Sequence, residues 1–166
     1  LDAIVLTHAH VDHIAMLPVL FRYGYRGPVY CTPPTRDLMT LLQMDYIKVS
    51  QAEGADPPYS KADIQECIKH VVDIRWGDKT DIAPDVKITL ENAGHILGSS
   101  SVYMQIGEGN SEHRLLFSGD IKYERSWLFD AATVRFQKVE TLVIESTYGG
   151  AQDFQPNRAD ATQELQ

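Results

Sequence analysis

The sequence has few cysteines, no long apolar run and no excess of positive charge. Its only cysteines, Cys31 and Cys67, are not spaced like a pair of metal ligands. Two isolated cysteines favour reduced thiols in a cytoplasmic protein, with a single disulfide as the alternative. No stretch reaches the roughly 18 apolar residues of a membrane span, and no basic segment followed by an apolar one indicates a signal peptide. We therefore predict a cytoplasmic chain without a membrane partner.

Acidic residues outnumber basic residues by 23 to 15, which gives the 166-residue chain a formal charge of −8. This balance argues against a surface covered with charge for nucleic acids, so a polyanion would have to be bound locally. Hydrophobic residues make up 43% and charged residues 23% of the chain, which is ordinary for a globular protein and argues against disorder. The length suits one domain.

The hydrophobic pattern predicts a mixed α/β protein. Residues 1–7 form an apolar run typical of a buried strand, and a 3.6-residue period from Thr32 to Gly54 predicts a long helix. Ser60 and Asp63 resemble a capping box at the start of another helix. Further elements are expected over 14–23 (helix) and over 29–31, 71–76, 86–92, 101–106, 114–118 and 141–145 (strands). This order favours helices covering the outer faces of sheets.

Both ends of the sequence resemble the interior of a longer chain. The first residues look like a strand already under way, and residues 157–166 look like a capped helix in its second or third turn. We therefore expect these 166 residues to be a piece of a longer polypeptide.

Four metal-ligand side chains lie within six residues, directly after the first predicted strand. They are His8, His10, Asp12 and His13. Imidazole and carboxylate groups are natural ligands of Zn²⁺, and alternate positions at the end of a strand direct His8 and His10 towards one ion. Asp12 and His13 lie one turn further on and face a second ion. The alternative is a histidine-rich surface loop, which would carry a needless desolvation penalty.

Two more candidate ligands follow later strands. His95 lies in a glycine-flanked turn, and Asp120 follows the apolar segment Leu116–Phe117. Taken alone, His95 is more often a core residue and Asp120 a turn former. Beside the first motif they become candidate ligands, because a two-zinc site needs one more imidazole and a bridging carboxylate.

These motifs together resemble the ligand order of the metallo-β-lactamase superfamily: HAHVDH at 8–13, GH at 94–95 and SGD at 118–120. The segment LVIESTYGG at 142–150 resembles the first signature of the β-CASP branch, which comprises nucleic-acid-processing nucleases. Residues 20–35 resemble the cleavage and polyadenylation specificity factor group, most closely its archaeal members. The resemblance covers essentially the whole chain.

The resemblance implies an incomplete αββα sandwich with metals at one edge. Residues 1–150 would be a partial metallo-β-lactamase domain and 151–166 the start of a β-CASP domain. In the family pattern one zinc is held by His8, His10 and His95, the other by Asp12 and His13, and Asp120 bridges them. Glu145 matches an acidic residue that orients a histidine of the β-CASP domain; the alternative is an ordinary acid at a strand end. The family's further ligands, an earlier aspartate and later histidines, have no counterpart in the 166 residues.

The leading hypothesis is a zinc-dependent ribonuclease that hydrolyses single-stranded RNA in 3′-end processing or transcription termination. Two Zn²⁺ ions would activate a water for attack on a phosphodiester, with Asp12 as a candidate acceptor of its proton. We expect endonuclease activity, with 5′-to-3′ exonuclease activity as a further possibility and a homodimer through parts outside this chain. The alternatives are a thioester, lactone or DNA hydrolase on the same metal site, and a non-catalytic scaffold. The 166 residues alone should show weak or no activity.

Overall fold

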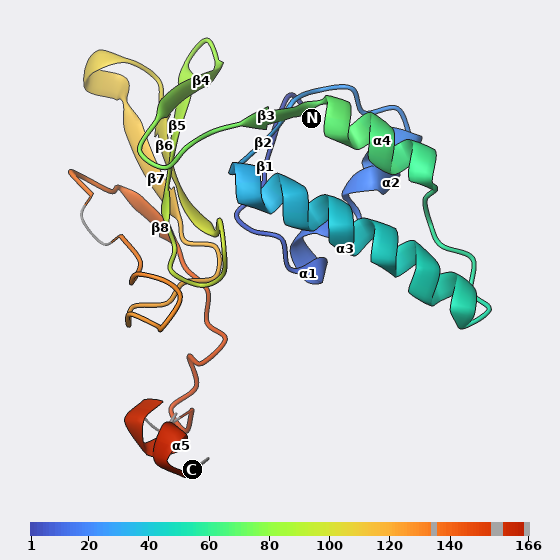
Figure 1. Cartoon of the computed structure of the whole chain (residues 1–166). Helices are drawn as coiled ribbons and strands as arrows, with labels where there is room; N and C mark the ends of the chain where they lie inside the picture. The colour runs from blue at the N-terminus through green and yellow to red at the C-terminus, as the bar shows by residue number, and fades with distance from the viewer. Residues whose placement is uncertain (134–135, 154–157, 165–166) are drawn as a thin grey trace.

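The computed structural model describes residues 1–133, 136–153 and 158–164. Two sheets pack against each other, and a layer of helices covers the far face of the smaller one (Figure 1). The smaller sheet has three parallel strands in the order β1-β2-β3. These are β1 (Ile4–Val5), β2 (Val29–Cys31) and β3 (Val71–Asp73).

Four helices form the covering layer. They are α1 (Val11–Ile14), α2 (Leu17–Arg22), α3 (Pro33–Ala52) and α4 (Lys61–Lys69). The long helix α3 begins where the Thr32 side chain accepts a hydrogen bond from the Thr35 N–H, a typical N-cap. Helix α4 begins with the predicted capping box, because Ser60 and Asp63 exchange side-chain-to-backbone hydrogen bonds.

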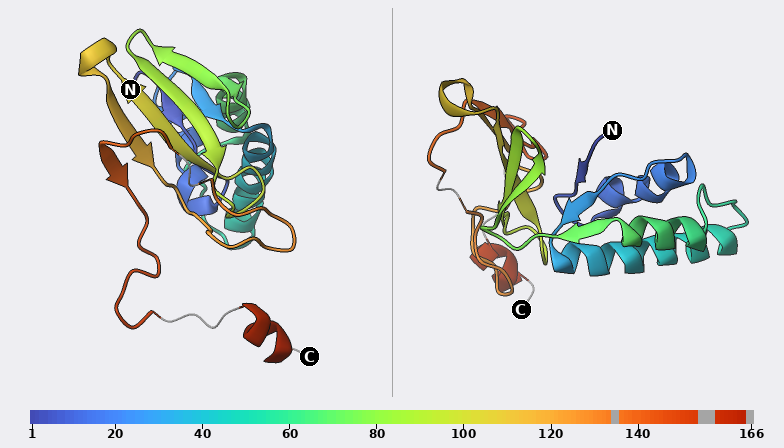
Figure 2. Two further views of the ribbon diagram at one scale, coloured as in Figure 1. Left: turned by 90° about the vertical axis from the view of Figure 1, so that its left-hand side faces the viewer. Right: turned by 90° about the horizontal axis from the view of Figure 1, so that it is seen from above.

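The larger sheet has five strands in chain order, antiparallel except for the parallel pair β7 and β8. They are β4 (Lys79–Ala83), β5 (Val86–Asn92), β6 (Ser100–Ile106), β7 (His113–Phe117) and β8 (Thr141–Val143), and the short 3₁₀ helix η1 (Gly109–Ser111) lies between β6 and β7. Helix α5 (Arg158–Glu164) lies away from both sheets in Figure 1 and in the left view of Figure 2.

The alternation of side chains along β2 separates two cores. Val29 and Cys31 face the helices and pack in a cluster with Phe21 and Met39. Tyr30, between them, points the other way and packs in the cluster formed by the inner side of the five-stranded sheet, which includes Leu90. Because successive strand residues point to opposite faces, this three-residue strand supports both cores.

Most predicted elements are confirmed, and the differences have clear causes. The strand predicted over 1–7 is only the two-residue edge strand β1, and Leu1 is exposed. The helix predicted over 14–23 is two helices, because Pro18 has no amide hydrogen and lies in the first turn of a new helix. The strand predicted over 71–76 ends at Asp73, and 141–145 ends at Val143.

Strand β4 was not predicted. Its sequence, Lys-Thr-Asp-Ile-Ala, has little apolar character, which is typical of an edge strand protected by charge. At the other end of the chain, the predicted helix start at Asn157 lies outside the described residues.

Neither cysteine is disulfide-bonded: Cys31 and Cys67 are both buried free thiols. Burial raises the pKa of each thiol to about 12, so both stay protonated and behave as small apolar core residues. None of the helices in the described ranges has the length and apolarity required to span a bilayer.

Candidate metal centre

The predicted ligands lie where strands of both sheets end. His8 and His10 follow β1, and His10 occupies the N-cap position of α1, which contains Asp12 and His13. His95 lies in the turn between β5 and β6, and Asp120 lies in the turn after β7. Residues more than 110 positions apart in the sequence thus meet at one edge of the two-sheet sandwich.

Three imidazoles and one carboxylate converge on a common point. One ligand atom from each of His8, His10, His95 and Asp120 lies within 4.8 Å of all the others. The Nδ1 atom of His10 lies 3.0 Å from both the His8 Nε2 and the His95 Nε2. The Oδ2 atom of Asp120 lies 3.7 Å from the His8 Nε2 and 3.5 Å from the His95 Nε2.

Hydrogen bonding alone explains this geometry poorly. A ring nitrogen carries either one hydrogen or one in-plane lone pair, so the His10 Nδ1 cannot form linear hydrogen bonds to both neighbouring rings. A divalent cation, in contrast, accepts lone pairs from several nitrogens at once. Three imidazole nitrogens and a carboxylate oxygen also match the ligand preference of Zn²⁺, so the residues present fit such an ion.

The surroundings of His8 and His95 favour the neutral imidazole, which is the form that binds metals. His8 is fully buried. Burial, assisted by the charges of His13, His10 and His95, lowers the pKa of His8 to about 3. Burial also lowers the pKa of His95, although the Asp120 carboxylate acts in the opposite direction. Near neutral pH these two histidines therefore offer lone pairs rather than positive charges.

Asp12 and His13 form a second, more open group beside the first. The His13 Nε2 lies 3.5 Å from the Asp12 Oδ2 and 3.6 Å from the Asp120 Oδ1. The two oxygens of Asp120 therefore face different groups of candidate ligands. The side chain of Asp12 is 77% exposed, so this second group is accessible to solvent.

Thr7 supports both groups, and sequence reasoning missed it. Its hydroxyl lies 3.1 Å from the His8 Nδ1 and 3.5 Å from the His13 Nδ1. Occupying the Nδ1 of His8 leaves its Nε2 directed towards the other ligands, a usual arrangement around metal-bound histidines. In the sequence, Thr7 is an ordinary β-branched residue at the end of a strand, so only its position next to His8 could have indicated this role.

Gly119 allows the Asp120 turn to approach Thr7. A Cβ atom on Gly119 would lie 2.8 Å from the Thr7 Cβ and 3.1 Å from the Ser100 carbonyl oxygen, and the backbone of Gly119 has a φ of +58°. Both the close contact and the left-handed backbone favour glycine here. The SGD motif thus brings the carboxylate of Asp120 against the end of the other sheet.

Glu145 lies next to the turn that carries Asp120. Its Oε1 atom accepts a hydrogen bond of 2.8 Å from the Ile121 N–H, and its own N–H donates to the Ser118 Oγ. Burial opposes the ionisation of Glu145, but hydrogen bonds from Thr147 and Ile121 outweigh it, so the pKa of Glu145 lies below its usual range. The Glu145 carboxylate thus holds the backbone directly after Asp120, and the Glu145 N–H holds the Ser118 hydroxyl before it.

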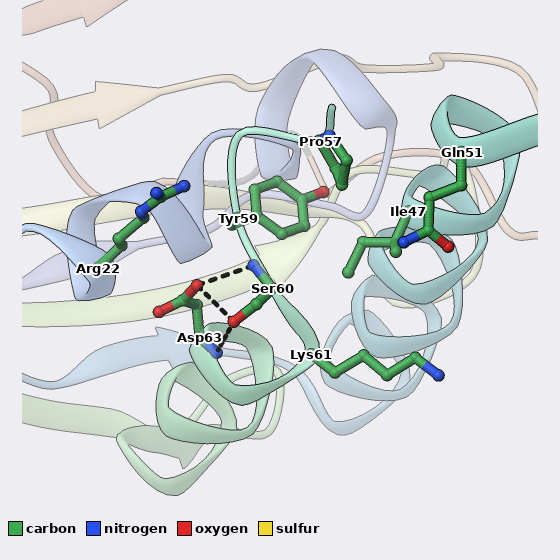
Figure 3. Close-up of a pocket in the computed structure, with 8 residues that line it drawn as sticks. All are labelled: Arg22, Ile47, Gln51, Pro57, Tyr59, Ser60, Lys61 and Asp63. Carbon is green, nitrogen blue, oxygen red and sulfur yellow. Dashed lines mark hydrogen bonds between the residues drawn. The ribbon is translucent and has the colours of Figure 1, made fainter. Parts of the chain in front are cut away.

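Apart from the metal cluster, a hollow of about 440 Å³ lies in the helical layer and contains none of the candidate ligands (Figure 3). Three of its polar side chains have partners within the chain, whereas the buried Tyr59 hydroxyl has no hydrogen-bond partner among the described residues. Asp63 and Ser60 cap α4, and the Arg22 guanidinium donates to the Pro58 carbonyl oxygen. The close-up shows Ser60 and Asp63 directed towards each other, and the hollow has no group of converging imidazoles like that of the metal cluster.

Comparison with known proteins identifies the family. A family model described as "Beta-lactamase superfamily domain" matches residues 1–159. The chain belongs to the metallo-β-lactamase superfamily. This confirms the resemblance to that superfamily and the expected α/β fold class, in which two sheets are accompanied by helices.

The similar curated proteins are archaeal. Transcription termination factor FttA of Methanocaldococcus jannaschii is 53% identical over 165 residues, which are 99% of this chain and 26% of that protein. The factor of the same name from Thermococcus kodakarensis is 53% identical over 166 residues and is covered to 25%. This metallo-β-lactamase superfamily chain thus spans about a quarter of the length of these relatives.

Two solved structures show distant likeness. Zn²⁺-bound PqqB from Methylobacterium extorquens is 17% identical with a TM-score of 0.43, over 70% of this chain and 33% of that one. A B3 metallo-β-lactamase with an active-site glutamic acid is 20% identical with a TM-score of 0.47, over 78% and 45%. At these levels of similarity, neither structure assigns roles to residues of the site.

Proposed function

We propose that this chain is the metal-binding part of a zinc-dependent ribonuclease that cuts single-stranded RNA during transcription termination or 3′-end processing. The observation that carries the proposal is the convergence of three imidazoles and one carboxylate within 4.8 Å. The relatives at 53% identity, named as transcription termination factors, favour RNA as the substrate. Endonucleolytic cleavage is the primary activity proposed, with 5′-to-3′ exonuclease activity as a secondary one.

The ligands divide between two zinc ions. His8, His10 and His95 would hold the first ion, since the His10 Nδ1 lies 3.0 Å from the Nε2 atoms of both His8 and His95. Asp12 and His13 hold the second, and Asp120 serves both, because its two oxygens face the two groups. When bound, the zinc ions supply a water nucleophile at neutral pH and positive charge for the phosphate oxygens.

Two acidic residues have further roles in this proposal. Asp12 is the candidate proton acceptor, because its carboxylate is open to solvent while lying 3.5 Å from His13. Glu145 is a positioning residue, because its hydrogen bond from the Ile121 N–H restrains the turn that presents Asp120. In the complete protein, Glu145 would also orient a histidine from a β-CASP domain.

The surrounding organisation follows from the same family pattern. Residues 1–150 are proposed as a partial metallo-β-lactamase domain, and residues 151–166 as the beginning of a β-CASP domain that supplies the other wall of the substrate groove. A homodimer through parts outside this chain and a cytoplasmic location remain predictions.

RNA cleavage and metal content together test the proposal. The polypeptide encoded by the complete reading frame is loaded with zinc and incubated with unstructured RNA, single-stranded DNA, and thioester and lactone substrates. We expect RNA cleavage that an Asp120→Asn variant abolishes. The matched control is Asp45→Asn, which changes an exposed aspartate on α3 outside the ligand cluster and should keep full activity.

Three results would contradict the proposal. Intact RNA together with turnover of an ester or of DNA would indicate another hydrolase on the same site. Equal RNA cleavage by wild type and Asp120→Asn would show that the cluster is not the active centre. A zinc content well below one ion per chain would favour a scaffold protein.

A further inference from the structure

An exposed aromatic turn lies close to the metal cluster. Trp127 and Leu128 are 84% and 83% exposed, and they occupy the tip of the loop that follows Asp120. The Ser126 N–H donates to the Phe129 carbonyl oxygen at 2.8 Å, and the Phe129 N–H donates to the Ser126 Oγ at 2.9 Å. These two hydrogen bonds close a tight turn that holds both apolar side chains outwards. Large adjacent apolar groups kept in water usually mark a binding surface.

The base of this loop is fixed to the turn that carries His95. The Lys122 N–H donates to the Ala93 carbonyl oxygen at 2.9 Å, and the Ala132 N–H donates to the Lys122 carbonyl oxygen at 2.8 Å. A Cβ atom on Gly94 would lie 2.7 Å from the Ala132 nitrogen and 2.8 Å from the Asp130 carbonyl oxygen. The two backbones are therefore in direct contact, which places the Trp127 tip at a defined position relative to His95.

A hollow of about 310 Å³ lies between the Trp127 tip and the candidate metal ligand His95. It is lined by His95, Lys122, Ser126, Trp127, Leu128 and Phe129. The lining combines an indole, aliphatic and aromatic surface, a hydroxyl and an ammonium group. No carboxylate in the described ranges pairs with the Lys122 ammonium, whereas the neighbouring Arg125 is paired with Asp130 at 3.3 Å. Lys122 therefore keeps its charge for a ligand.

We infer that this hollow binds a nucleotide next to the cleaved bond, with its base stacked on the indole of Trp127 and a phosphate near the Lys122 ammonium. This inference rests on the proposed function, because the hollow shares His95 with the metal cluster. Stacking on an aromatic side chain is tolerant of base identity. Base stacking would also allow a chain with a net charge of −8 to bind a polyanion locally, largely through uncharged contacts. The same chemistry serves RNA and DNA.

Binding of short single-stranded oligonucleotides to this chain tests the inference. Affinity is measured by the anisotropy of a labelled oligouridylate, the matching deoxyoligonucleotide and an abasic oligomer with the same phosphates. Trp127→Ala should weaken binding of the base-bearing oligomers by about five-fold or more, the usual effect of removing a stacking aromatic. Trp127→Phe should restore most of it. Tyr23→Ala, which removes an aromatic side chain that is 83% exposed on the helical layer, should bind as wild type does.

The indole itself supplies a second measurement. Stacking of a base should quench tryptophan fluorescence in wild type, and the loss of that quenching in Trp127→Phe should identify Trp127 as its source, since Trp76 remains in both. The inference is overturned if folded Trp127→Ala binds as tightly as wild type, or if the abasic oligomer binds as tightly as the base-bearing ones. Unchanged binding of RNA by Trp127→Ala, together with cleavage that still requires Asp120, would refute this subsite and leave the proposed function intact. Absence of RNA cleavage by the complete protein would refute the proposed function itself.

Discussion

The two groups of ligands in the cluster differ in how firmly the fold holds them. The closed group consists of His8, His10 and His95. His8 is fully buried, and its second ring nitrogen, Nδ1, lies against the Thr7 hydroxyl. His95 lies in a turn in which the Ser99 Oγ accepts a hydrogen bond from the His95 N–H. At the open group, Asp12 and His13 lie on α1, a helix of four residues, and the side chain of Asp12 is largely in solvent.

This difference predicts the order in which the two ions bind. Ligands that are already held in place lose little conformational entropy when an ion arrives, so the closed group should bind the first zinc tightly. The open group must still order a solvent-exposed carboxylate, so it should bind the second zinc more weakly. Each of the following predictions tests this difference.

Asp120→Asn should have the largest effect, because Asp120 is the only ligand that faces both groups. We expect both zinc ions to be bound at least about a hundred-fold more weakly, since loss of a ligand should cost at least as much as loss of the groups that support ligands. Zinc content after equilibrium dialysis measures this, with Asp45→Asn as the control. Retention of one tightly bound ion would show that Asp120 serves only one group.

Asp12→Asn should affect the open group alone. Zinc titration should show that the tight site is kept and the weak site is lost. Cleavage of RNA by the complete protein should fall by about 10²-fold or more, as expected when a proton acceptor is removed. Loss of the tight site in this variant would mean that the two groups are not separable.

The closed group should also make the metal-free chain sensitive to acid. The pKa of His8 is lowered to about 3 in the folded state from 6.5 in the unfolded state, so below pH 6.5 the unfolded chain binds a proton that the folded chain does not. The free energy of unfolding should therefore fall by about 2 kcal/mol between pH 7 and pH 5. Urea unfolding in the presence of a chelator measures this. His8→Gln should reduce the slope, and a variant slope equal to that of wild type would contradict the assignment.

Thr7→Val should have the smallest effect, confined to metal affinity. The valine keeps the shape of the side chain but removes the hydroxyl that contacts His8, so the tight zinc should bind about ten-fold more weakly. Ser111→Ala, at an exposed hydroxyl far from the cluster, should leave zinc affinity unchanged. An equal loss in both variants would argue against a specific role for Thr7.

The sequence was most informative where chemistry and spacing coincide. The ligand motif at residues 8–13 could be proposed because four metal-ligand side chains lie within six residues. His95 and Asp120 could then be proposed because a two-zinc site needs one more imidazole and a bridging carboxylate. The layers could be proposed because hydrophobic period distinguishes strands from helices. Edge strand β4 could not be predicted, because its charged residues give it no clear hydrophobic pattern. The role of Thr7 could not be predicted either, because it depends on a contact between its hydroxyl and an imidazole rather than on residue type.

Trp127 and Glu145 show the same limit. An aromatic residue in a loop is usually a packing residue, and only the fold reveals that Trp127 is exposed beside His95. The acidic residue after a strand could be matched to a family signature, but its hydrogen bond to the Ile121 N–H depends on the parallel pairing of β7 with β8. Both features arise from tertiary contacts that no local pattern encodes.

The origin of the ligands in two different sheets has a mechanical consequence. His8 and His10 extend from the three-stranded sheet, whereas His95 and Asp120 extend from the five-stranded one. An ion held by all four would act as a cross-link between the sheets, in a chain whose two thiols form no such link. Chelation should therefore do more than stop chemistry: it should release the seam between the sheets and speed hydrogen exchange along it.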